Sequence, residues 1–177
     1  MELKSVYKRG AEYGWKFGLY LSALFFAIVY SSQLPFLAYI GMFLLLLIPF
    51  VVYGFLRRCY ILEGGTSSFS TLWMLGILIF IYGSLICGIV TYVWLQYVMP
   101  NYIYDSAQAF IKLYESMPEM KNSEGLKVMR MAVDQKMLPS AIEFVFNMIW
   151  FTTFFGSVLS IFESLAARMR GIGSKKF

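Results

Sequence analysis

The chain has 177 residues, of which 59% are hydrophobic and only 14% are charged. Soluble domains carry about 25% charged residues, so this composition excludes an ordinary soluble domain and indicates a membrane protein. The net charge of +5 is concentrated beside apolar stretches, where it suits anionic lipid headgroups, and it gives no indication of nucleic-acid binding.

Four apolar stretches follow one another along the chain, each near or above the ~20 residues that a helix needs to cross a bilayer. They predict an all-α membrane protein with transmembrane helices at about 13–33, 36–57, 70–98 and 139–166. We expect one four-span domain over 1–177. The first stretch has a basic lead-in but no small-x-small cleavage triplet after it, so we expect an uncleaved span and no signal peptide.

Small residues recur at helical spacing in three of the predicted spans. They are Gly10, Gly14, Gly18 and Ser22 in the first, Gly76 and Gly83 in the third, and Gly156 and Ser160 in the fourth. Apolar burial does not drive helices together inside lipid, and small residues permit the close backbone approach that does. We predict that they form an internal packing seam, with homodimerisation through the first span as the alternative. No strand precedes these glycines, which excludes a nucleotide-binding motif.

The segment "RRCYILEGGTSSFSTLW" joins the second and third spans. Arg57 and Arg58 end the second span, Gly64 and Gly65 allow the chain to reverse, and a hydroxyl such as that of Ser68 caps the third helix. These residues suit a lipid-phosphate or partner contact at a helix N-terminus. Snorkelling arginines beside a glycine turn explain the same pattern without a ligand.

Lysine and arginine are distributed unequally between the two membrane faces. They dominate the N-terminal lead-in, the 57–71 loop and the C-terminal tail, whereas "SSQLP" is uncharged and 99–138 balances acids with bases. The positive-inside rule therefore predicts that both termini and the 57–71 loop are cytoplasmic.

The long segment 99–138 is predicted to form an extracytoplasmic helical hairpin. "YDSAQAFIKLYESM" and "SEGLKVMRMAVDQKML" each place apolar residues at helical spacing, and "MPEMKN" separates them. The methionine pairs in "MPEM" and "MRM" resemble Cu(I) spacings, but ordinary helix packing explains them better, and we predict no metal site and no cofactor.

Candidates for chemistry are few. Glu143 and Asn147 lie one turn apart near the start of the fourth span, as an intramembrane proton or cation site or as boundary residues beside a helix N-terminus. Glu163 is interpreted as an interfacial charge. Without histidine no Ser–His or Cys–His pair exists, and a disulfide between Cys59 and Cys87 is not expected, so the sequence argues against catalysis.

The chain resembles the domain-of-unknown-function family numbered 4199, known mainly from the Bacteroidota. The residues that carry the resemblance are "YGWKFGLYLS", "YGFLRRCY" and above all "GGTSSFSTLW", followed by "MPNYIYD" and the proline-led fourth span. The resemblance implies a bacterial inner-membrane protein with four spans and a helical insert before the last, and it supplies no catalytic residues. It also implies a partner protein, because genes of this family often lie beside genes for polyprenyl-phosphate glycosyltransferases.

We therefore expect a non-catalytic accessory or scaffold subunit of an envelope or lipid-linked glycan process. Its expected partners are the bilayer and another membrane protein, such as a polyprenyl-phosphate glycosyltransferase. The alternative is a small oligomeric transporter or channel that uses Glu143 and a bend at Pro49.

Overall fold

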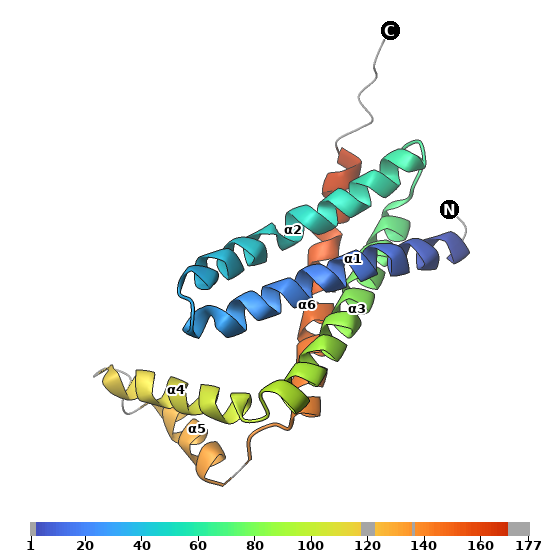
Figure 1. The fold of residues 1–177 in the computed structure, drawn as a ribbon. Helices are drawn as coiled ribbons and strands as arrows, with labels where there is room; N and C mark the ends of the chain where they lie inside the picture. The colour runs from blue at the N-terminus through green and yellow to red at the C-terminus, as the bar shows by residue number, and fades with distance from the viewer. Residues whose placement is uncertain (1–2, 118–122, 136, 170–177) are drawn as a thin grey trace. The chain divides into compact units, whose positions relative to one another are not determined.

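A computed structural model describes residues 3–117, 123–135 and 137–169, and every regular element in these ranges is helical (Figure 1). Four of the helices are long and apolar enough to cross a membrane. The all-α, four-span prediction is therefore confirmed. Most of the predicted "MPEMKN" separator lies outside the described residues.

The helices follow one another with short connections. They are α1 (Leu3–Val29), the 3-10 turn η1 (Tyr30–Ser32), α2 (Phe36–Leu62), α3 (Phe69–Val93), the π-helical η2 (Trp94–Val98), α4 (Tyr102–Ser116), α5 (Glu124–Asp134) and α6 (Ala141–Met169). The first helix begins well before residue 13, because its polar lead-in continues the same helix. The π-helical turn after α3 was not predicted either.

The chain divides into two compact units. The first comprises Met1–Val90 and Met148–Phe177, and the second comprises Thr91–Asn147. In the first unit the fully buried side chains come from several helices and include Phe17, Leu56 and Ile79. In the second, α4 and α5 pack together, Arg130 pairs with Glu115, and the Ser123 hydroxyl caps α5 by accepting from the Leu126 amide.

Glycines bring α1 close to α3. A Cβ built on Gly14 would lie 2.5 Å from the Cβ of Tyr82, and one on Gly18 would lie 2.7 Å from the Cβ of Ile86. Gly10 meets Leu78 in the same way, at 2.8 Å. Because a real Cβ cannot approach so closely, this spacing of the two backbones requires glycine on α1.

The small residues of α3 and α6 also lie at contacts between helices. A Cβ on Gly76 would be 2.5 Å from Ser160 Oγ, and one on Gly156 would be 2.2 Å from the ring of Phe80. Gly83 faces the ring of Phe17, which meets Phe80 edge to face at 5.0 Å between centroids. These contacts place the two helices and α1 around one shared core.

Ser22 and Ser160 satisfy their hydroxyls within their own helices. Ser22 Oγ donates to the carbonyl oxygen of Gly18, and Ser160 Oγ donates to that of Gly156, each at 2.8 Å. Both serines are buried, so these bonds remove the cost of placing a hydroxyl in an apolar contact.

Candidate functional site

The reversal after α2 is built by two glycines. Gly64 and Gly65 have φ of +64° and +78°, in the left-handed region that residues with a side chain rarely adopt. Their amides donate to the carbonyls of Ile61 and Tyr60, each at 3.0 Å, which satisfies carbonyls left open at the end of the helix. The Gly-Gly pair is therefore explained by the turn itself.

Hydroxyls after the glycines order the start of α3. Ser68 Oγ accepts from the Thr71 amide at 3.2 Å, as an N-cap does. Thr66 Oγ1 donates to the carbonyl oxygen of Glu63 at 2.7 Å. Ser68 is exposed, so its hydroxyl caps the helix at the surface of the unit.

Arg57 and Arg58 do not end the helix as predicted, since α2 continues to Leu62, and their surroundings differ. Arg57 Nη1 donates to the carbonyl oxygen of Ala167 in α6 at 2.8 Å, and its guanidinium lies 5.6 Å from the centre of the Tyr60 ring. Arg57 thus ties the end of α2 to the end of α6. Arg58 is exposed on the same turn of α2 and presents a positive charge to its surroundings.

Glu63 is a structural residue that sequence reasoning missed. Its Oε1 lies 2.9 Å from Arg9 Nη1 of α1, and its Oε2 accepts a hydrogen bond from Ser67 Oγ. The side chains of Arg9 and Glu63 are 29% and 14% exposed, so the pair is largely shielded. The sequence does indicate that Glu63 is unusual, since it is a lone acid in a basic segment. Nothing in the sequence identifies Arg9 as its partner.

Glu143 lies at the start of α6 and is exposed. Its Oε2 accepts from the amide and the hydroxyl of Ser140, at 2.8 and 2.9 Å, while Ser140 Oγ accepts from the Glu143 amide at 3.4 Å. This reciprocal pattern is a capping box. Asn147, one turn later, is also exposed. The structure thus places both at the surface of the second unit.

Glu163 is buried, although we interpreted it as an interfacial charge. The residue is 5% exposed, and neither carboxyl oxygen has a hydrogen-bond partner among the described residues. It shares one face of α6 with Gly156, Ser160 and Ala167, which are buried as well. Glu163 is buried because other helices cover this face of α6. The sequence does not show which face is covered, so it could not distinguish Glu163 from an exposed acid.

A cavity of about 430 Å³ adjoins Glu163. Its lining comes from α2 (Pro49, Phe50, Tyr53) and α6 (Leu159, Phe162, Glu163, Ala166). A second, apolar cavity of about 550 Å³ shares Pro49 and Leu159 with the first and continues toward Leu45 and Phe155. Both hollows are therefore lined by α2 and α6, and the second also by α1 (Leu21, Leu24) and α3 (Phe80).

The positions of the cysteines and the acidic side chains bear on metal and thiol chemistry. Within 3–117, 123–135 and 137–169, no three His, Cys, Asp or Glu side chains cluster so that they could hold a metal ion. Cys59 and Cys87 are both buried, and no disulfide joins them. Neither cysteine is paired with the other, as the sequence led us to expect.

The sequence model of one family matches most of the chain. It covers residues 12–169, and its description is "Protein of unknown function (DUF4199)". No curated protein and no solved structure showed a significant match. The match includes the turn of Gly64 and Gly65, the Ser68 cap and the seam glycines of α1, α3 and α6 other than Gly10.

Proposed function

The chain belongs to the DUF4199 family, and we propose that it is a non-catalytic accessory or scaffold subunit in the bacterial inner membrane. Four apolar helices make it a multi-pass membrane protein. The proposed process is the assembly or handling of an envelope glycan linked to lipid.

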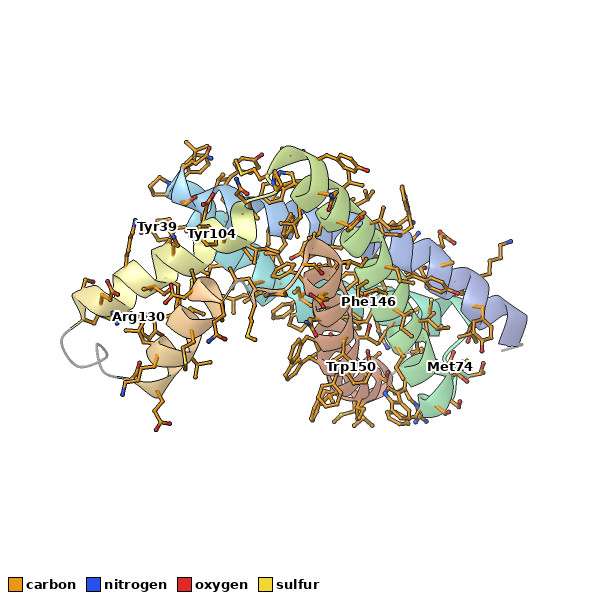
Figure 2. All side chains as sticks on the ribbon, turned by 90° about the horizontal axis from the view of Figure 1, so that it is seen from below. Tyr39, Met74, Tyr104, Arg130, Phe146 and Trp150 are labelled. Atoms are coloured by element: carbon orange, nitrogen blue, oxygen red, sulfur yellow. The ribbon has the colours of Figure 1, made fainter. Side chains whose placement is uncertain are left out.

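One observation carries the proposal: α2 and α6 are hardly covered by the rest of the chain. Buried residues make up 11% of the most apolar window of α2 and 17% of that of α6, against 44% for the first span and 56% for the third. Large side chains such as Phe50, Trp150 and Phe155 are 69%, 67% and 64% exposed (Trp150 is labelled in Figure 2). Lipid alone can cover such a surface, and so can the helix of a partner.

The hollow between α2 and α6 favours a protein partner on this surface. Close packing between membrane helices depends on shape, because lipid tails are as apolar as the side chains. The two adjoining cavities beside Pro49 and Leu159 provide a recess into which side chains of another helix would fit. A membrane-embedded glycosyltransferase that uses polyprenyl phosphate is the partner we propose.

The charge distribution supports an orientation with both termini in the cytoplasm. Arg57 and Arg58 lie in the last two turns of α2, and Arg9 of α1 pairs with Glu63 just after the end of α2. Positive residues beside spans are retained on the cytoplasmic side. In this orientation Arg58 faces the anionic headgroups of the inner leaflet, and we propose that it takes part in lipid-phosphate contact there.

Photocrosslinking in living cells tests the accessory role. A photoreactive phenylalanine analogue replaces Phe155 in the full-length chain, and the same analogue replaces Ile89, which is 65% exposed on α3, as the control. We expect a discrete adduct from position 155, identified by mass spectrometry as a membrane protein of lipid-linked glycan metabolism, and lipid adducts from position 89. Lipid adducts alone at both positions, or an adduct only with a second copy of the chain, would contradict the proposal.

A further inference from the structure

A buried carboxyl without a partner distinguishes α6 from the other membrane helices. Glu163 is 5% exposed, and both of its carboxyl oxygens lack a hydrogen-bond partner within the described part of the chain. The hydroxyl of the neighbouring Ser164 is buried and unpartnered as well. Glu163 precedes Ala167, the acceptor for Arg57, by one helical turn, or about 6 Å of rise.

Such a group is costly in its ionised form. An isolated carboxylate in an apolar environment loses far more hydration energy than a neutral polar group does, and it persists only when something compensates its charge. Acids inside membrane helices accordingly pair with another group or exchange protons. Glu163 must therefore either meet a cation or take up a proton.

The lining of the cavity beside Glu163 favours a proton over a metal cation. Pro49, Phe50, Leu159, Phe162 and Ala166 contribute no side-chain oxygen, and Tyr53 adds a single hydroxyl. Hard metal cations require about six oxygen ligands. No metal-binding cluster of His, Cys, Asp or Glu occurs in the described ranges either. A proton needs only the carboxylate itself.

Among the described residues of α1, α2 and α6, every other charged side chain pairs with another group or is exposed. Arg57 of α2 donates to the Ala167 carbonyl, and Arg9 of α1 pairs with Glu63. The stretch Phe69–Val98 contains no Asp, Glu, Lys or Arg. On α2, Tyr53 lines the same cavity and Cys59 is buried as a free thiol; on α6, Arg168 is exposed.

We propose that Glu163 is a proton-binding site inside the membrane-spanning part of this protein, and that the cavity beside Pro49 gives access to it. Protonation converts the carboxylate to a neutral acid, and no other atom is exchanged. The ring of Pro49 lines the wall of this cavity, and α2 lacks one backbone hydrogen bond at this residue because proline has no N–H. Proton binding at Glu163 is tested on the protein alone, in which no partner side chain occupies the cavity, so its outcome is separate from that of the proposed partner.

Carbodiimide labelling tests the proposal on the full-length protein in liposomes. Dicyclohexylcarbodiimide is apolar and adds to protonated carboxylic acids, and peptide mass spectrometry locates the adduct. We expect the adduct on Glu163 at a yield at least about tenfold above that on Glu143, a ratio equivalent to about 1.4 kcal/mol. The yield on Glu163 should fall as the buffer is changed from mildly acidic to alkaline.

Two variants and one salt serve as controls. Glu163→Gln should remove the adduct on residue 163, and Glu143→Gln should leave it unchanged. The ratio of the yields on Glu163 and Glu143 is measured within one wild-type sample, so it does not depend on how well either variant folds. Equal labelling of both glutamates, or a yield on Glu163 that does not change with pH, would overturn the proposal. Protection by sodium chloride but not by choline chloride would overturn it in favour of a metal cation.

Discussion

Replacing Gly14 by alanine is expected to lower the free energy of unfolding by about 1–3 kcal/mol, the usual cost of overpacking a close contact. The added Cβ would lie 2.5 Å from the Cβ of Tyr82 and 3.4 Å from the backbone oxygen of Ile79. Neither atom is the end of a flexible side chain, so α1 and α3 must move apart. Because Phe17 of α1 fits against Gly83 in the same contact, the separation also disturbs the shared core.

Gly54→Ala is the matched control for this prediction. Gly54 lies in α2 and is exposed, and a Cβ added to it would meet no other atom within 4 Å. The same substitution should there leave stability unchanged or raise it slightly, since alanine favours helix over glycine. Unfolding by sodium dodecyl sulfate in mixed micelles, followed by tryptophan fluorescence, measures both variants. Equal stability of the two would show that α1 and α3 do not pack through this stripe.

Glu63→Ala is expected to lower the free energy of unfolding by about 1.5–3 kcal/mol, the range for hydrogen bonds that involve a charged group. The carboxylate accepts from Arg9 of α1 and from Ser67 in the loop, so its removal breaks a link between α1 and the α2–α3 turn. It also leaves the buried hydroxyl of Ser67 without its acceptor. The partial exposure of Arg9 keeps the expected loss below that of a fully buried ion pair.

Glu12→Ala provides the comparison for Glu63. Glu12 pairs with Lys16 at 3.3 Å on the surface of α1, where the lysine and glutamate side chains are 52% and 61% exposed. An exposed pair one turn apart on a helix contributes only about 0.3–0.5 kcal/mol. The same micelle titration should therefore distinguish the two variants clearly. Similar losses for both would mean that Arg9, Glu63 and Ser67 do not act together.

The fold class was predictable because it depends on the composition of long segments. A span needs enough consecutive apolar residues, and the four stretches satisfy this without any knowledge of their neighbours. The Ser123 cap of α5 was predictable for a similar reason, since the cap and its amide lie three residues apart. Features of this kind could be predicted because the residues that form them are close together in the sequence.

The interactions that define the candidate site were not predictable in this way. Arg9 and Glu63 are 54 positions apart, and Arg57 and Ala167 are 110 apart, so only the packing of α1, α2 and α6 brings them together. The burial of the two glutamates of the fourth span could not be predicted from the sequence either. Glu143 lies within an apolar stretch of the sequence but caps the helix at the surface, whereas Glu163 near the other end is buried. Which side of a helix is covered depends on its neighbours.

Thiol labelling tests the proposed orientation, in which the four spans place the Gly64–Gly65 loop and both termini on the cytoplasmic face. In a chain with Cys59→Ala and Cys87→Ala, a single cysteine is placed at Thr66 in the loop or at Ser106 in α4, both exposed positions. Spheroplasts are treated with a maleimide that cannot cross the membrane. We predict that Ser106→Cys is labelled in intact spheroplasts and Thr66→Cys only after the membrane is opened. Labelling of Thr66→Cys in intact spheroplasts would contradict this orientation.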